Sequence, residues 1–302
     1  MKRLEIQAPA KINLYLDVLG KRIDGYHEIN SLLVPVSLCD QLILEAMPEK
    51  INTVAKSFTH FEGIPWPVFL GLRKENLVTR AAHLLKEATG YRGGARIVLK
   101  KNIPIAGGMG GGSSDAAAVL QGLNTLWNTG LSREEMMALG SKLGSDIPAL
   151  VHGGAIKMNG RGECIQAVRR AVPPSLWLVL VNPGLCISTG DIYSRYRPDL
   201  TSPPTEGRFD SILSGLEEGS LDQIAAGLFN ALQRTVFQKY PLLEIIYNEL
   251  EKANAKGVLL SGTGSTVFAL VENRAQGCEL EARIRGDLGC PLWTCVVQAI
   301  EE

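Results

Sequence analysis

A glycine-rich stretch between residues 103 and 118 carries the residue types best suited to chemistry. It reads IPIAGGMGGGSSDAAA, with five glycines within six positions. Glycine allows positive φ and lets a ligand approach the backbone closely. The next three residues, Ser113, Ser114 and Asp115, favour the N-cap or first turn of a helix. Because residues 95–100 alternate like a half-buried strand, the predicted order is strand, glycine loop and helix start.

This arrangement suits an anion such as phosphate. The free N–H groups of a helix start and the positive end of its dipole face the loop, and a glycine loop can wrap a phosphate with backbone donors. No lysine follows the glycines as a P-loop requires, and no dinucleotide-binding register G-x-G-x-x-G is present. The alternative is a flexible connection. Phosphate binding is favoured because the glycines are concentrated immediately before a helix start.

Lys11 and Asn13 lie two positions apart in a segment, residues 11–19, whose polar and apolar side chains alternate. The period of two places Lys11 and Asn13 on the same face of a predicted strand. From the residues alone, a solvated strand face is the better interpretation of this pair.

Asp146 and His27 also have ordinary structural interpretations. Asp146 precedes Ile147-Pro148, which is the pattern of a helix start with proline in the first turn, so Asp146 by itself is predicted to be an N-cap. Tyr26 and His27 follow an Asp-Gly turn signal and are predicted to begin a strand. A lone histidine at such a place is more often structural than functional.

Composition narrows the class of protein. The 302 residues suggest about two domains, and Lys plus Arg equals Asp plus Glu at 31 each. This balance argues against nucleic acid or an anionic membrane surface as a partner. No apolar run approaches a membrane span and the start has no signal-peptide pattern. The six cysteines are scattered, which predicts buried thiols in a reducing cytosol and a cytoplasmic protein.

The remaining pattern alternates strands and helices and predicts an α+β protein. A capping box begins a helix at Ser132-x-x-Glu135, residues 160–163 form a turn, and a domain boundary is plausible near Pro173-Pro174. Loops are predicted at 64–67 and, as a mobile segment, at 197–208. Further strands are predicted at 31–45, 155–158, 176–181, 258–261, 266–271 and 292–297, and further helices from 77 and 187 and over 221–232, 242–253 and 274–288.

Three stretches together resemble the GHMP small-molecule kinases. They are APAKINL at 8–14, the glycine loop at 104–118 and LSGTGS at 260–265. The motifs extend from residue 8 to about residue 270, so the resemblance covers most of the chain. It implies two α+β domains with the active site between them. Residues 1–172 would form a ribosomal protein S5 domain 2-like domain, and residues 173–302 a ferredoxin-like domain.

Other motifs resemble the members of this family that phosphorylate the 2-hydroxyl of a cytidine-diphosphate methylerythritol. They are KINL at 11–14, RIDGYHE at 22–28, LGSDIP at 143–148 and GRGE at 160–163. The resemblance implies that Lys11 and Asp146 flank the acceptor hydroxyl. A carboxylate there can accept the hydroxyl proton, and an ammonium keeps it ionised and compensates charge on the acceptor oxygen. With this resemblance, a solvated strand-face lysine and an N-cap aspartate become the less favoured interpretations of Lys11 and Asp146.

The resemblance also implies the binding residues and the cofactors, ATP and Mg²⁺. The nucleotide would contact Asn76, Leu77, Lys101, Pro104, Ile105, Ala106, Gly107, Gly108, Met109, Gly110, Gly111, Gly112, Ser113 and Ser114. The acceptor would contact Asn13, Tyr26, His27, Thr189, Gly190, Tyr193, Gly262, Thr263 and Gly264. Magnesium could touch Ser113, Ser114 or Asp115, and the sequence does not choose among them. It also leaves monomer and homodimer open.

Three other functions compete with this interpretation. A GHMP kinase for mevalonate or homoserine would have no reason to carry Asp24-Gly25-Tyr26-His27 together with Tyr193. A non-catalytic, sugar-sensing protein of the same fold could lose Lys11 or Asp146, and this chain keeps both. A dinucleotide-dependent oxidoreductase is disfavoured because its glycine fingerprint is missing.

Overall fold

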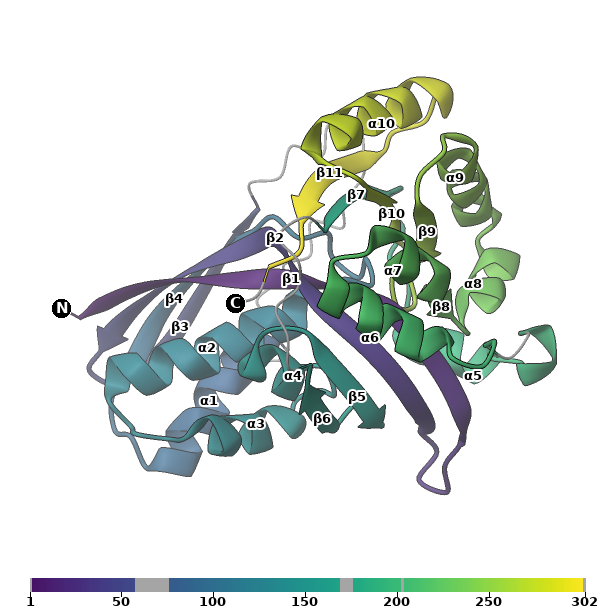
Figure 1. Cartoon of the computed structure of the whole chain (residues 1–302). Helices are drawn as coiled ribbons and strands as arrows, with labels where there is room; N and C mark the ends of the chain where they lie inside the picture. The colour runs from purple at the N-terminus through teal and green to yellow at the C-terminus, as the bar shows by residue number, and fades with distance from the viewer. Residues whose placement is uncertain (1, 58–75, 169–175, 202–203, 301–302) are drawn as a thin grey trace.

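The computed structural model describes residues 2–57, 76–168, 176–201 and 204–300. The loop predicted at 64–67 and the boundary predicted near Pro173-Pro174 lie outside these ranges. Within them the chain forms two sheets, one of seven strands and one of four, with helices packed around both (Figure 1). No helix in this part of the chain is both long and apolar enough to cross a membrane.

The seven-stranded sheet is built on a long antiparallel pair, β1 (Arg3–Lys21) and β2 (His27–Met47). β4 (Gly94–Lys101) pairs with β2, and β3 (Ile51–Ser57) lies parallel beside β4. A hairpin of β5 (Ile156–Gly160) and β6 (Cys164–Ala167) extends the sheet from β2. Its helices are α1 (Leu77–Thr89), α2 (Gly111–Trp127), α3 (Arg133–Ser141) and α4 (Ile147–His152).

Local signals position these helices as the sequence predicts. Asn76 caps α1, because its side chain accepts a hydrogen bond from the backbone N–H of Val78 at 2.9 Å. The capping box of α3 is confirmed, with Ser132 and Glu135 each accepting from the other's backbone N–H. α1 and α2 pack on the sheet through an apolar cluster that includes Leu42, Leu85 and Leu120.

The four-stranded sheet has the order β11-β7-β10-β9, and every pair in it is antiparallel. Together with α10, which follows β10, this order is that of the ferredoxin-like fold, as the family resemblance implied. The strands are β7 (Trp177–Asn182), β9 (Gly257–Leu260), β10 (Val267–Val271) and β11 (Trp293–Gln298). The helices are α5 (Thr189–Arg195), α6 (Arg208–Glu218), α7 (Leu221–Gly227), α8 (Gln233–Lys239), α9 (Pro241–Lys252) and α10 (Arg274–Asp287).

The helix predicted over 221–232 is confirmed only over its first seven residues. α7 ends at Gly227, and the two-residue strand β8 (Phe229–Asn230) follows it and pairs in parallel with β1. Gly227 lies so close to α6 that a Cβ atom there would be 2.1 Å from Ile212 Cγ1. The segment 197–208 is also not one loop, since it contains a 3₁₀ turn at Pro198–Leu200 and the first residue of α6. The sequence pattern does not predict the strands β3, β6 and β8 or the helices α6 and α8.

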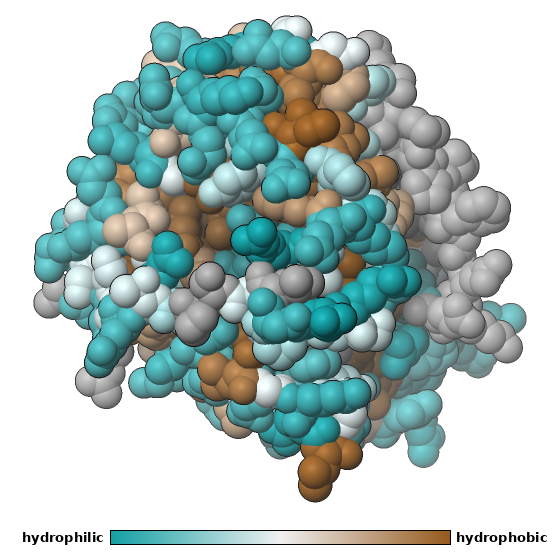
Figure 2. Space-filling view, turned by 90° about the vertical axis from the view of Figure 1, so that its right-hand side faces the viewer, coloured by the Kyte–Doolittle hydropathy of each residue, from teal (hydrophilic) through white to brown (hydrophobic). Residues whose placement is uncertain are grey.

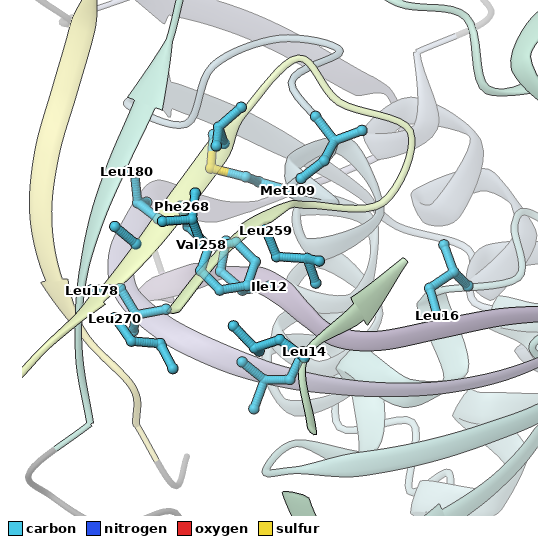
Figure 3. Packing of buried hydrophobic residues seen from close by; sticks show 14 of the residues in the cluster. Ile12, Leu14, Leu16, Met109, Leu178, Leu180, Val258, Leu259, Phe268 and Leu270 are labelled. Carbon is cyan, nitrogen blue, oxygen red and sulfur yellow. The ribbon is translucent and has the colours of Figure 1, made fainter. Parts of the chain in front are cut away.

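One apolar cluster contains side chains from both sheets and packs them together. β1 and β2 contribute Ile12, Leu14 and Val34 to the same apolar cluster as Leu180 of β7 and Phe268 of β10. Figure 3 shows Met109 of the glycine loop within this packing. On the face shown in Figure 2 most side chains are hydrophilic, and a hydrophobic protrusion lies at its lower end, where Figure 1 places the turn between β1 and β2. Ile23 in that turn is fully exposed.

Candidate active site

A pocket of about 440 Å³ lies where the two halves of the chain meet. It contains residues from β1, the glycine loop, the start of α4, α5 and the turn between β9 and β10. Most of the residues predicted for the site line it: Lys11, Asn13, Asn76, Leu77, Lys101, Pro104, Ile105, Ala106, Gly107, Gly108, Gly110, Gly111, Gly112, Ser113, Asp146, Thr189, Tyr193, Gly262 and Thr263. Six predicted residues are absent from its lining: Met109, Ser114, Tyr26, His27, Gly190 and Gly264.

Lys11 lies at the centre of this pocket. Its side chain is 7% exposed, and its Nζ is 3.5 Å from Asp146 Oδ2 and 2.5 Å from Asn13 Oδ1. Asn13 donates in turn to Ser31 Oγ at 2.9 Å, and Ser31 donates to the Tyr15 carbonyl. The solvated strand face predicted for Lys11 and Asn13 is therefore wrong, because the C-terminal half of the chain covers that face.

Asp146 stands at the N-cap position of α4 but does not cap it. Its backbone is helical, with φ −79° and ψ −17°, and its side chain makes no capping hydrogen bond. The carboxylate instead faces the Lys11 ammonium. An aspartate that is not used to cap its helix is available for chemistry in the pocket.

The glycine loop ends directly at α2, which begins at Gly111 after Gly110 in the left-handed region with φ +65°. The N-cap or first-turn placement predicted for Ser113, Ser114 and Asp115 is confirmed for Ser113, which is the third helical residue. The N-cap itself is Gly110, and Ser114 and Asp115 lie further along the helix. The first N–H groups of α2 thus belong to glycines that line the pocket. This is the arrangement that accommodates a phosphate against the backbone.

Backbone contacts hold the glycine loop against the turn between β9 and β10. Thr266 N donates to the Gly107 carbonyl at 3.0 Å, and Ser261 Oγ donates to the Gly108 carbonyl at 3.1 Å. Lys11 N donates to the Met109 carbonyl at 3.0 Å. The Met109 side chain is 1% exposed and belongs to the apolar core, which explains why it does not line the pocket. The two glycine motifs therefore form one continuous wall.

We expect Gly108→Ala to weaken ATP binding about tenfold or more, because small misplacements of a binding loop are costly. Gly108 has φ +79°, and a Cβ atom there would lie 2.2 Å from the Ser261 carbonyl oxygen. Gly130→Ala is the matched control, since Gly130 has φ +74° but no atom within 4 Å of its added Cβ. Calorimetric titration with a non-hydrolysable ATP analogue measures the nucleotide affinity of both variants. Equal ATP affinity in the two variants would remove the loop from the nucleotide site.

Aromatic rings gather beside the pocket around Tyr193. The His27 and Tyr193 ring centroids are 5.2 Å apart, and Thr189 Oγ1 is 3.2 Å from Thr263 Oγ1. Burial and the neighbouring Lys21 charge lower the pKa of His27, so its neutral form is favoured at neutral pH. Burial, reinforced by the Asp146 charge, raises the pKa of Tyr193. Tyr26 is half exposed and carries the Arg161 guanidinium over its ring at 4.9 Å.

Several pocket residues carry no local signal that sequence reasoning could use. Ser31, Met158 and Ile187 line the pocket, yet each lies in an ordinary strand or loop pattern. Asp40 lies beneath the glycine loop, fully buried, and its side chain binds Lys101 and the backbone of Asn102 and Ile103. These contacts join positions about sixty residues apart in the chain, so no sequence window contains them.

Two family models match the chain. Residues 76–154 match the GHMP kinases N terminal domain, and residues 212–287 match the GHMP kinases C terminal model. A 4-diphosphocytidyl-2-C-methyl-D-erythritol kinase from Pelotomaculum thermopropionicum is 42% identical over 92% of this chain and 92% of its own length. A kinase of the same name from Bacillus cereus is 39% identical over 90% of this chain and 89% of its own length.

Solved structures agree with these relatives. A crystal structure of 4-(cytidine 5′-diphospho)-2C-methyl-D-erythritol kinase has a TM-score of 0.77 and 33% identity, covering 98% of this chain and all of that one. A homoserine kinase from Cytophaga hutchinsonii, with a TM-score of 0.72, 18% identity and coverage of 100% and 96%, shares the fold. The chain therefore belongs to the GHMP kinases, in the family of the 4-diphosphocytidyl-2-C-methyl-D-erythritol kinases.

Proposed function

We propose that this chain transfers the γ-phosphoryl group of ATP to the 2-hydroxyl of 4-diphosphocytidyl-2-C-methyl-D-erythritol, giving the 2-phosphate and ADP in the non-mevalonate isoprenoid pathway. One observation carries the chemical part: Lys11 Nζ lies 3.5 Å from Asp146 Oδ2 in the pocket that also contains the glycine loop. Asp146 accepts the hydroxyl proton as transfer proceeds, and Lys11 keeps that carboxylate ionised and steadies the acceptor oxygen.

The nucleotide side of the pocket provides backbone donors rather than a P-loop lysine. Gly110, Gly111 and Gly112 line the pocket at the start of α2, where they would face the phosphates. Asn76 and Leu77 line it at the start of α1, where they would face the base and ribose. Phosphoryl transfer passes through a loose transition state, so positioning and charge compensation supply most of the catalysis. The pocket has the elements for both.

Magnesium fits the residues at the start of α2. Asp115 lines the pocket, and its Oδ1 is buried without a hydrogen-bond partner among the described residues, while Ser113 lines the pocket beside it. In the described parts of the chain, no three or more His, Cys, Asp or Glu side chains cluster so that they could hold a metal ion. This fits a metal that is bound by few protein groups and by substrate phosphates. When bound with ATP, magnesium would neutralise charge on the β- and γ-phosphates.

Tyr193 and His27 provide the groups for reading the cytidine end of the acceptor. A neutral imidazole has one donor and one acceptor for a pyrimidine edge, and the Tyr193 ring can stack on the base. Asn13, Thr189, Gly262 and Thr263, which line the pocket, would surround the remainder of the acceptor. All six cysteines are free thiols, in keeping with a cytoplasmic enzyme that works as a monomer or homodimer. The prediction that they are buried is wrong, because three of them are exposed and the other three are partly exposed.

The choice of acceptor tests this proposal. A uridine acceptor reverses the donor and acceptor pattern at ring position 4 and the adjacent nitrogen, which leaves buried groups unmatched at about 1–3 kcal/mol each. We expect kcat/KM for the uridine acceptor to fall at least about tenfold below the cytidine one. Tyr193→Ala should lower kcat/KM for the cytidine acceptor by a stack worth roughly 1–3 kcal/mol.

Tyr193→Phe is the matched control, because it keeps the ring and should retain most of the acceptor kcat/KM. The KM for ATP should stay unchanged in both variants, since Tyr193 comes from α5 and lies on the acceptor side. Equal use of the cytidine and uridine acceptors by the unaltered enzyme would overturn the cytidine assignment and leave a GHMP kinase with another acceptor.

A further inference from the structure

A buried cluster of three ionisable side chains lies beneath the glycine loop. Asp40 of β2 is 0% exposed, Lys101 at the end of β4 is 6% exposed, and Asp115 of α2 is 2% exposed. Lys101 Nζ donates to Asp40 Oδ2 and, at 2.8 Å, to Asp115 Oδ2. Burial raises the pKa of Asp115, and the two carboxyl groups share the one Lys101 ammonium. Burying such a cluster is costly unless hydrogen bonds satisfy its polar groups.

Asp40 fixes the chain where it leaves β4 toward the glycine loop. The ladder between β2 and β4 ends at the pair Gln41 and Lys100, and Asp40 and Lys101 are the residues just beyond that pair. Asp40 Oδ1 accepts from Asn102 N at 2.5 Å and from Ile103 N at 2.9 Å. The loop begins at the next residue, Pro104, so these two hydrogen bonds set the direction in which it departs.

The second arm of the cluster fixes the other end of the loop. Lys101 links Asp40 to Asp115, which lies in the second turn of α2. Lys101 also lies directly under the helix start, because a Cβ atom added to Gly111 would be 3.2 Å from its Nζ. Both ends of the loop from Pro104 to Gly110 are thus linked to Asp40. The first end is linked directly through the Asn102 and Ile103 N–H groups, and the second through Lys101 and Asp115.

We infer that Asp40 is a positioning residue for the ATP-phosphate loop, acting through the Asn102 and Ile103 N–H groups and through Lys101 on Asp115. This inference rests on the proposed role of the loop in holding ATP. Asp40 does not line the pocket, so it acts on the nucleotide only through the groups it binds. Its loss is therefore expected to affect ATP first, because none of Asn102, Ile103 and Asp115 is among the residues proposed to contact the acceptor.

Asp40→Asn tests the inference, because asparagine keeps an acceptor for the two N–H groups but loses the charge that holds Lys101. We expect the KM for ATP and the Kd of a non-hydrolysable ATP analogue to rise about 10- to 100-fold, as misplacement of a binding loop by about an ångström does. The KM for the cytidine acceptor should stay within about twofold of its original value, since a misplaced donor loop removes no acceptor contact.

Asn124→Ala is the matched control at the far end of the same helix. Asn124 also makes three hydrogen bonds, donating to the Leu131 carbonyl and accepting from Thr129 Oγ1 and Leu131 N. Its loss should lower the melting temperature and leave both KM values unchanged. If Asp40→Asn behaves like Asn124→Ala, losing stability with an unchanged ATP KM, Asp40 is only a structural residue and the inference is overturned.

Lys101→Arg keeps the inference testable if Asp40→Asn does not fold. Arginine retains the charge but cannot place one nitrogen between Asp40 and Asp115 in the same way, so a selective rise in the ATP KM is again expected. An unchanged ATP KM in a folded Lys101→Arg enzyme overturns the inference. The Gly108→Ala titration separates the role of the loop from the role of Asp40. An unchanged ATP affinity in Gly108→Ala rejects the loop as the nucleotide site. A weakened ATP affinity in Gly108→Ala with an unchanged one in Asp40→Asn rejects only the positioning role of Asp40.

Discussion

The Asp146→Asn enzyme is expected to lose about 10²-fold or more in kcat while it folds normally. Asparagine has the size of aspartate, but it cannot take the proton of the acceptor hydroxyl. α4 loses nothing by the change, because the Asp146 side chain makes no capping hydrogen bond. Single-turnover measurement of phosphoryl transfer, with KM values for both substrates, checks this.

Asp222→Asn is the control for this experiment. Asp222 lies in the first turn of α7 and its carboxylate is mostly exposed, paired with Lys256 at 3.2 Å. Its replacement should leave kcat unchanged, since surface ion pairs contribute little. A kcat for Asp146→Asn within about threefold of the original would show that Asp146 is not the base, because a positioned base contributes far more.

The Lys11→Met enzyme is expected to lose about 10²- to 10³-fold in kcat, the range found when one preorganised electrostatic contact to the reacting centre is removed. Methionine retains most of the apolar stem. The hydrogen bond from the Lys11 backbone N–H to the Met109 carbonyl is also kept, so the glycine loop stays in place and ATP affinity should change little.

The double variant Lys11→Met with Asp146→Asn tests whether the two residues act as a unit. Groups that act together in one step give losses that are far from additive. The double variant should therefore be little slower than the slower single variant. Losses that multiply would contradict the proposal, because they would mean that Lys11 and Asp146 stabilise the transition state independently.

The sequence predicted those parts of the fold that depend on near neighbours. Asn76 and the pair Ser132 and Glu135 cap their helices through residues two or three positions away. The strands β9 and β10 and the turn between them follow from an apolar run broken by glycines. Phe229 and Asn230 were assigned to a helix because their pairing with Tyr15 and Leu16 lies more than two hundred residues away in the chain.

The site was predictable in part for the same reason. Alternation places Lys11 and Asn13 on one face of β1, but it does not say that the turn at Gly262 covers that face. A Cβ atom added to Gly262 would lie 3.3 Å from Asn13 Oδ1. The family resemblance named both residues, whereas Asp40 could be found only from the structure, because its partners lie on β4 and the segment after it.

The strand β1 contributes side chains to two apolar clusters, and this limits how far the two halves of the enzyme can move apart. Ala8 packs with the helices α1 and α2, while Ile12 and Leu14 pack with the strands of the C-terminal sheet. β8, from the second half of the chain, pairs with β1 a few residues beyond Lys11. A hinge that swung one half of the protein away from the other would have to break this pairing and open the core. We therefore expect substrates to enter by local adjustments of the segments around the pocket, with the Lys11 and Asp146 side chains already facing each other at 3.5 Å.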